Sequence, residues 1–134
     1  MLVTVLAGAA FAFLVWAVAD TLDTDKDLAD FGSPVESRAF VSAHLPLALP
    51  ADAAVTALHY ERFTDWILTA QVRLASEEAA TAYLEQLRAA RKLNDAYCGD
   101  DEPSAGARYF LSDVSACGRV TNVGGTLSVR CNTR

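Results

Sequence analysis

The chain has 134 residues, of which 52% are hydrophobic, and a formal net charge of −6. Once its apolar N-terminal segment is set aside, this length accommodates one small domain and excludes a second. The net acidity argues against nucleic acid as a partner, because binding to a phosphate backbone needs a surplus of Lys and Arg.

An apolar segment without charged side chains opens the chain and ends at Asp20. As a helix, residues 2–19 would be roughly 27 Å long at about 1.5 Å per residue, close to the ~30 Å hydrocarbon thickness of a bilayer. Trp16 lies where an interfacial aromatic belongs. These features predict a single-pass transmembrane signal-anchor over residues 1–19, with the rest of the chain outside the cytoplasm.

The same segment has a second interpretation. Ala17-Val18-Ala19 matches the small-x-small cleavage site of an export signal, so the mature protein would then begin at Asp20. If the segment is retained, Gly8 and Ala12 have the small-xxx-small spacing that lets another transmembrane helix approach closely. Retention or removal of residues 1–19 therefore separates an anchored protein from a secreted one.

Residues 20–33 are dominated by aspartate, with Lys26 as the only basic residue. Charges of one sign at this density repel one another and stay solvated, so the segment predicts an acidic tether. The domain, residues 34–134, is expected to begin with a short helix from Pro34 to about His44. Ser33-Pro34-Val35-Glu36 predicts its start, because Ser caps the helix, Pro occupies the first turn and Glu follows three residues after the cap.

The clearest strand pattern covers residues 66–74, where apolar and polar side chains alternate with a period of two. Residues 55–60 are expected to pair with it as a hairpin across the loop 61–65. His59 and Glu61 share one face of the first strand. Two ligands without a third do not make a specific metal site, so we interpret both as surface residues.

A helix is predicted over about residues 77–94, with Ser76 as its cap. Glu77 and Glu78 in the first turn and basic residues in the last turn complement the helix dipole. One face of the helix carries Ala80, Tyr83, Leu84 and Leu87 at the appropriate spacing. We expect this face to cover the sheet.

Three further strands are predicted near residues 108–114, 118–123 and 126–132. The last two are joined by a turn at Gly124-Gly125. A two-residue turn places Arg119 opposite Arg130, which is unfavourable unless an anion or a carboxylate lies between them. A three-residue turn places Cys117 opposite Cys131 instead.

The three cysteines, Cys98, Cys117 and Cys131, all lie in the last third of the chain. This grouping is typical of a small exported domain held together by a disulfide. We expect one intramolecular disulfide and favour Cys117–Cys131, with the two pairings through Cys98 as alternatives. The odd number leaves one free thiol.

Arginines stand out among the polar side chains predicted for the solvent side of the sheet. Arg73, Arg119 and Arg130 are the candidate partner-binding residues, because guanidinium groups bind carboxylates in bidentate geometry and are enriched at interface hot spots. An anionic protein surface or an anionic envelope polymer would fit them. The ordinary interpretation is that any half-exposed sheet carries polar residues on this side.

Several short motifs between Leu45 and Leu87 carry a resemblance. They are Leu49-Pro50-Ala51-Asp52-Ala53, Asp65-Trp66 before the second strand, and the helix that starts at Ser76. This arrangement resembles uncharacterised small exported or membrane-anchored proteins of high-GC bacteria. The resemblance implies a small extracytoplasmic α+β domain and carries no activity. The Cys that follows the signal in lipid-linked members is missing here.

Together these patterns predict an α+β protein with one transmembrane helix and a mainly antiparallel sheet of about five strands, covered by a helix. The expected function is a membrane-tethered extracytoplasmic binding module or an accessory subunit of an envelope complex. The alternative is a secreted binding protein or inhibitor freed after Ala19. A small hydrolase ranks last, since only two His are present and no Ser-His-Asp or Cys-His pairing has a recognisable spacing. We expect no cofactor and no metal.

Overall fold

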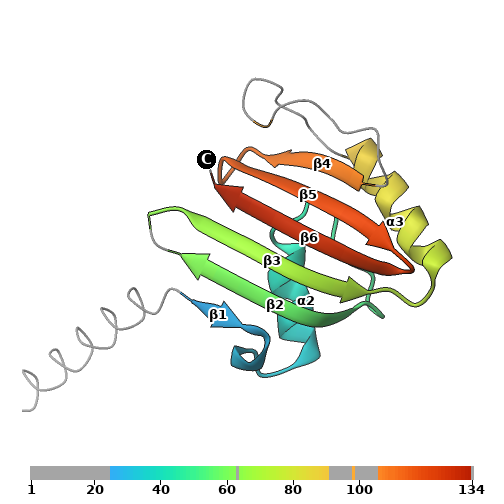
Figure 1. Ribbon diagram of the computed structural model, residues 1–134, viewed down its shortest axis with the longest axis horizontal. Coiled ribbons are helices and arrows are strands. Elements are labelled where there is room, and N and C mark those ends of the chain that lie inside the picture. Colours follow the sequence, from blue (N-terminus) through green and yellow to red (C-terminus); the bar gives the residue numbers. More distant parts are fainter. Residues whose placement is uncertain (1–24, 63, 91–97, 99–105, 134) are drawn as a thin grey trace, which may run out of the picture.

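The computed structural model describes residues 25–62, 64–90, 98 and 106–133 (Figure 1). The predicted transmembrane segment, with Gly8 and Ala12, lies outside these residues, as does the first part of the predicted tether. Within the described ranges, no helix combines the length and the apolar character needed to cross a membrane.

Six strands form one antiparallel sheet in the order β1-β2-β3-β6-β5-β4 (Figure 1). The strands are β1 (Lys26–Asp27), β2 (Ala54–Arg62), β3 (Trp66–Arg73), β4 (Gly106–Leu111), β5 (Ala116–Val123) and β6 (Thr126–Thr133). The pairing of β3 with β6 joins the β2–β3 hairpin to the C-terminal strands. The predicted α+β domain with a mainly antiparallel sheet is therefore confirmed, and the additional strand is the short β1.

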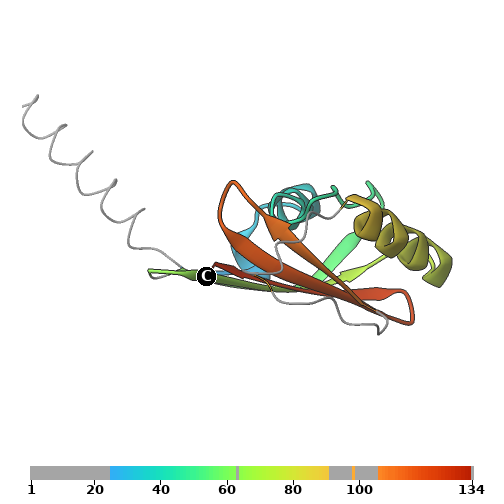
Figure 2. The ribbon, with the colours of Figure 1, turned by 90° about the horizontal axis from the view of Figure 1, so that it is seen from above.

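Two helices, α2 (Pro34–Ser42) and α3 (Glu77–Ala90), lie on the same side of the sheet (Figure 2). Both have the predicted serine caps. The hydroxyl of Ser33 accepts a hydrogen bond from the backbone N–H of Glu36 at 3.2 Å, and the hydroxyl of Ser76 accepts one from the N–H of Ala79 at 3.0 Å. The sequence predicted one covering helix, and the fully buried Val41 shows that α2 shares this role.

The core lies between these helices and the inner face of the sheet. The central strands contribute the fully buried side chains Leu68, Val72, Val120, Leu127 and Val129. The predicted face of α3 is buried against them, with Ala80, Tyr83, Leu84 and Leu87 at most 5% exposed. Each large apolar side chain removed from water contributes about 1.5–3 kcal/mol. Because successive strand residues point to opposite sides, the outer face is left to the alternating polar positions.

Tyr109 on β4 lies over Gly118, its cross-strand partner on β5. A Cβ atom at position 118 would lie 1.9 Å from Cζ of Tyr109, so only glycine leaves room for the ring. Tyr109 is fully buried, and its hydroxyl donates a 2.8 Å hydrogen bond to the carbonyl oxygen of His44. This contact ties the β4–β5 pair to the segment that follows α2.

The second half of the predicted acidic tether is part of the domain. Lys26–Asp27 forms β1 on the edge of β2, and the short 3-10 helix η1 (Leu28–Asp30) follows. The ring of Phe31 then packs against Phe40 of α2, with 5.1 Å between the ring centroids. Charge density alone predicted a solvated spacer. The exposed edge of β2, however, offers backbone groups that need partners, and this segment supplies them.

The β5–β6 hairpin turns at Gly124 and Gly125, whose φ angles are +60° and +88°. Positive φ at both positions of a two-residue turn suits the right-handed twist of the strands, and glycine adopts it without strain. The resulting register pairs Arg119 with Arg130. Of the two alternatives left by the sequence, the chain adopts the two-residue turn.

The disulfide joins Cys98 to Cys117, with 5.6 Å between their Cα atoms. One intramolecular disulfide was predicted, but the favoured Cys117–Cys131 pairing is wrong. In the register of the two-residue turn, Cys117 faces Asn132 and Cys131 faces Gly118, so the two cysteines point to opposite sides of the sheet. Cys131 is the free thiol, and it is fully buried in the core.

Candidate anion-binding site

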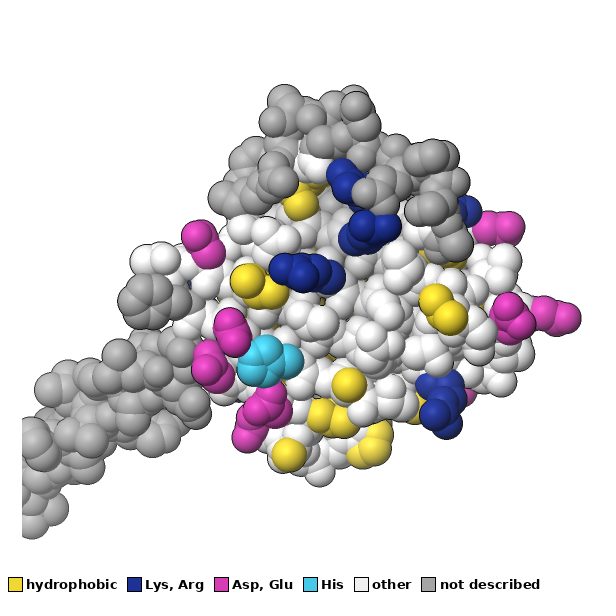
Figure 3. Space-filling view, viewed as in Figure 1, with side chains coloured by type: hydrophobic (Ala, Val, Ile, Leu, Met, Phe, Trp, Pro, Cys, Tyr) yellow, Lys and Arg dark blue, Asp and Glu magenta, His cyan; other side chains and the backbone are white. Residues whose placement is uncertain are grey.

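The open face of the sheet, as we call the side opposite α2 and α3, is viewed front-on in Figure 3. Basic side chains gather over β4, β5 and β6, whereas acidic side chains and a histidine lie near β1 and β2 (Figure 3). The polar residues of β3, β5 and β6 on this face include Thr69, Gln71, Arg119, Thr121, Ser128 and Arg130. The open face therefore carries most of its basic side chains over β4, β5 and β6 and a group of acidic side chains near β1 and β2.

Three arginines form a line across the basic end of the open face, one on each of three neighbouring strands. Arg108 on β4 pairs with Arg119 on β5, which pairs in turn with Arg130 on β6. Arg119 and Arg130 are exposed, and Arg108 is half-buried. Adjacent strands are about 4.8 Å apart, so the three Cα atoms span about 10 Å across the sheet. We call Arg108, Arg119 and Arg130 the arginine row.

The structure brings together two of the three arginines that the sequence predicted. Arg119 and Arg130 are direct cross-strand partners, but Arg73 pairs with Thr126 near the end of β3. The residue of β3 opposite Arg130 is Thr69. Arg73 is therefore displaced from the row by about 13 Å along the strand, at about 3.3 Å per residue.

Arg108 is the member of the row that the sequence did not single out. It lies between the buried residues Ala107 and Tyr109, an alternation that marks it for the open face. Its place beside Arg119 depends on the turn at residues 112–115, whose sequence Ser-Asp-Val-Ser contains no tight-turn pattern. The sequence predicted that this strand continues to residue 114, whereas β4 ends at Leu111.

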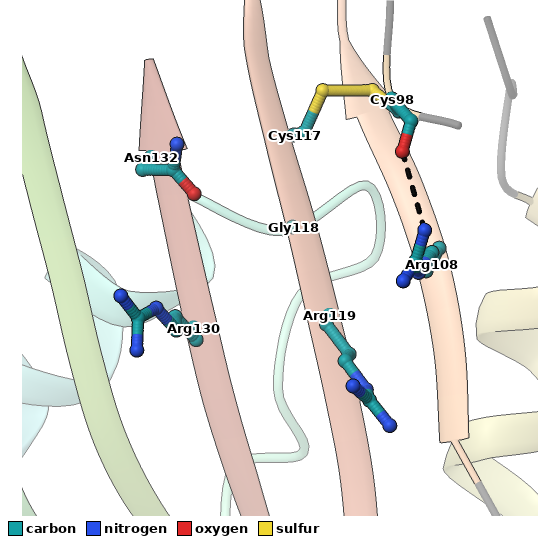
Figure 4. Close-up of a pocket in the computed structure, with 7 residues that line it drawn as sticks. All are labelled: Cys98, Arg108, Cys117, Gly118, Arg119, Arg130 and Asn132. Atoms are coloured by element: carbon teal, nitrogen blue, oxygen red, sulfur yellow. Dashed lines mark hydrogen bonds between the residues drawn. A yellow bond between two sulfur atoms is a disulfide. The ribbon is translucent and has the colours of Figure 1, made fainter. Parts of the chain in front are cut away.

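Two shallow depressions of the described surface lie along the row. One, of about 150 Å³, is lined by Cys98, Arg108, Cys117, Gly118, Arg119, Arg130 and Asn132 (Figure 4). The disulfide bounds it at one end, where an Nη1–H of Arg108 donates to the carbonyl oxygen of Cys98 at 3.3 Å (Figure 4). The other, of about 240 Å³, is lined by Thr69, Arg119, Thr121, Ser128, Val129 and Arg130. Arg119 and Arg130 line both depressions.

The chemistry of this arrangement favours anions. Like charges directly opposite each other destabilise a strand pair, and Figure 4 shows the guanidinium groups of Arg119 and Arg130 pointing away from each other. An anion near both groups would offset their repulsion. Guanidinium groups bind carboxylate and phosphate in bidentate geometry, and Asn132 and Thr69 bring amide and hydroxyl donors to the two depressions.

His59 lies between two carboxylates at the other end of the open face. Its Nδ1 is 2.6 Å from Oδ1 of Asp27, and its Nε2 is 2.8 Å from Oε1 of Glu61. The hydrogen bond with Asp27, followed by that with Glu61, raises the pKa of His59 from 6.5 to about 9, so the ring is protonated at neutral pH and donates to both carboxylates. The sequence placed Glu61 beside His59, but Asp27 joins them only because β1 pairs with β2. We call these three residues the histidine cluster.

The second histidine, His44, lies on the inner side of the sheet among aromatic rings. Its ring centroid is 4.8 Å from that of Phe40 and 4.9 Å from that of Trp66. Burial lowers the pKa of His44, and its Nδ1 is 2.7 Å from the carbonyl oxygen of Phe40. The neutral ring donates there, which gives this histidine a structural role.

Among the described residues, no group of three or more His, Cys, Asp and Glu side chains is arranged to hold a metal ion. In comparisons with known proteins, no family model, no curated protein and no solved structure matches the chain. The resemblance to exported proteins of high-GC bacteria stays a prediction. We therefore infer the function from the geometry of the open face.

Proposed function

We propose that the chain is a membrane-tethered extracytoplasmic binding module, or an accessory subunit of an envelope complex, that binds an anionic partner on its open face. The partner would be another envelope protein or an anionic envelope polymer. One observation carries the proposal: the strand register sets Arg119 between Arg108 and Arg130 on an open face. Like charges on neighbouring strands disfavour strand pairing, whereas an anionic ligand gains several charge-assisted hydrogen bonds from these side chains.

Two further features support the proposed location at the membrane, outside the cytoplasm. The Cys98–Cys117 disulfide is of the kind that forms and persists in oxidising compartments outside the cytoplasm. The apolar run over residues 2–19 has the length of a membrane span. Removal of this segment after Ala19 would make the same domain a secreted binding protein or inhibitor, which is the second candidate function.

Binding is tested with the full-length chain in mild detergent, applied to beads that carry polyphosphate or poly-L-glutamate and to uncharged beads as a control. We expect retention on polyanion beads and its loss in the double variant Arg119→Gln/Arg130→Gln. Arg73→Gln, which removes one positive charge from the same face outside the row, is the matched control for each of the single variants Arg119→Gln and Arg130→Gln. Unchanged retention of the double variant would overturn the proposed site. If Arg73→Gln lost as much retention as these single variants, the binding would be a diffuse charge attraction without a specific site.

Retention of the membrane anchor is tested separately by intact-mass analysis of protein isolated from membranes. We expect a mass that includes residues 1–19. A mature N-terminus at Asp20 would refute the anchor and support the secreted alternative, without bearing on the open face.

A further inference from the structure

We propose that the arginine row binds a linear phosphate polymer that lies across the strands and that the row contacts three successive phosphate groups. This inference rests on the proposed binding function and specifies the chemistry of the partner. A row of arginines favours an extended ligand, whereas a pocket favours a small one. All three arginines line the first depression and Arg119 and Arg130 line the second, so a single anion occupies one depression, whereas a linear polyanion is able to extend along the row through both.

The direction of the row favours a linear ligand. The three arginines follow the line of cross-strand pairing, about 4.8 Å apart, and the two depressions extend on either side of Arg119 and Arg130. Arginine side chains are long enough to adjust each guanidinium group by a few ångströms. The row is therefore able to follow the repeating phosphates of a chain that lies across the strands.

The donors beside the row favour phosphate. Thr69 and Thr121 line one depression and Asn132 lines the other, so hydroxyl and amide groups accompany the arginines. The hydroxyl of Ser128, which also lines the first of these, donates to Oε1 of Gln71 at 3.1 Å. Arginine together with Ser, Thr and Asn is the set of side chains that contacts phosphate oxygens in protein complexes with nucleic acids. The ligand chemistry is thus shared with nucleic acid, although the net charge of −6 opposes a long duplex.

An acidic peptide fits this site less well. Extended peptides bind sheets by adding to an edge, where their backbone N–H and C=O groups complete the ladder. A peptide lying across the open face would have no strand beside it, so its backbone groups would bond water and add nothing to the affinity. A phosphate chain has no such groups to satisfy and needs only the side-chain donors that the row provides.

The histidine cluster limits the length of the site. The line of cross-strand pairs continues from Arg130 to Thr69, then to His59 and to Asp27. Asp27, His59 and Glu61 together carry one net negative charge at neutral pH, because one imidazolium offsets only one of two carboxylates. A polyanion that passes Thr69 therefore meets repulsion, and the favourable stretch ends after the three arginines.

The test measures the affinity of the full-length chain, in mild detergent, for orthophosphate, tripolyphosphate and long-chain polyphosphate. We expect tripolyphosphate to bind at least about tenfold more tightly than orthophosphate, and Arg130→Gln to weaken tripolyphosphate binding by about tenfold. The logarithm of the affinity should fall with the logarithm of salt concentration with a slope of about −2 to −3, and Arg130→Gln should reduce this slope by about one. Arg73→Gln should change affinity by less than about twofold.

The limit on length is tested by Glu61→Gln, which leaves His59 paired with Asp27 and removes the net negative charge of the cluster. We expect about two- to threefold tighter binding of long-chain polyphosphate and no change for orthophosphate. Glu85→Gln on the exposed face of α3 is the matched control, since it changes the total charge equally on the other side of the sheet. Equal effects of both variants would overturn the assigned end of the site.

The outcomes separate this inference from the function on which it rests. If poly-L-glutamate binds as tightly as polyphosphate and depends equally on Arg130, the phosphate inference fails while the anion-binding function stands. If neither polymer binds, both fail. Equal affinity for orthophosphate and tripolyphosphate would refute contact with successive phosphates. A thermal unfolding midpoint at or above that of the parent chain confirms that Arg130→Gln is folded, because the substitution removes a charge opposite Arg119.

Discussion

Gly118→Ala should destabilise the domain far more than the addition of one methyl group suggests. The new Cβ would lie 1.9 Å from Cζ and 2.3 Å from the hydroxyl oxygen of Tyr109. Ordinary contact begins near 3.4 Å, so the ring has to move by more than an ångström. Tyr109 is fully buried and has no empty space to enter at close-packed density.

The magnitude follows from three contributions. Overpacking of a core typically costs about 1–3 kcal/mol. A shift of the ring also breaks the 2.8 Å hydrogen bond from the Tyr109 hydroxyl to the carbonyl oxygen of His44, and an unsatisfied buried polar group costs about 1–3 kcal/mol. Replacement of glycine within a strand returns about 0.5–1 kcal/mol of backbone entropy. The net loss is about 3 kcal/mol, which lowers Tm by more than about 10 °C in a domain of this size.

Urea unfolding followed by tryptophan fluorescence, in which Trp66 reports on the domain, measures this loss, and a double-mutant cycle identifies its cause. In a Tyr109→Leu background, which removes the ring from above position 118, Gly118→Ala should cost less than about 1 kcal/mol. A cost below about 0.5 kcal/mol in the parent chain would refute the close packing of Tyr109 on Gly118. An equal cost in both backgrounds would assign the effect to the strand itself.

Peptide mapping without reduction should recover Cys98 linked to Cys117, and Cys98→Ser should lower the free energy of unfolding by about 3 kcal/mol, from the chain-entropy estimate for a loop with a sequence separation of 19. Three free thiols in native protein would contradict both the pairing and the oxidising compartment. In an NMR titration, His59 should have a pKa of about 9 in place of 6.5, and Asp27→Asn should lower it. Because its pKa is raised in the folded state, the stabilisation by His59 is complete below about pH 6.5 and is lost as the pH rises through about 9. The stability advantage of the parent chain over Asp27→Asn should therefore decrease as the pH rises through about 9. An increase over this range would refute the histidine cluster.

Local patterns in the sequence were sufficient to predict the elements that build the core. The serine caps at Ser33 and Ser76 start α2 and α3, because they satisfy backbone donors within a few residues of themselves. The periodic apolar positions of α3 and β3 predicted their buried faces, since each face is set by the geometry of a single element. The Gly124-Gly125 turn located the last hairpin for the same reason.

Only the tertiary structure decided how those elements meet. Lengthening the β5–β6 turn by one residue shifts the register and moves every side chain of one strand to the other face of the sheet. The choice between an Arg119–Arg130 pair and a Cys117–Cys131 pair could therefore not be made from alternation alone. The two-residue turn placed Cys117 on the open face, where it pairs with Cys98.

The candidate site depends most on such long-range registers. Arg108 joins the row through a turn without a tight-turn pattern, and Asp27 reaches His59 through a strand of two residues that composition alone marked as solvated. Residues far apart in sequence carry no local record of their pairing, because the partner strand supplies the backbone hydrogen bonds that hold each of them in place. The sequence by itself thus determined which faces are buried, and the fold decided which charges share the open face.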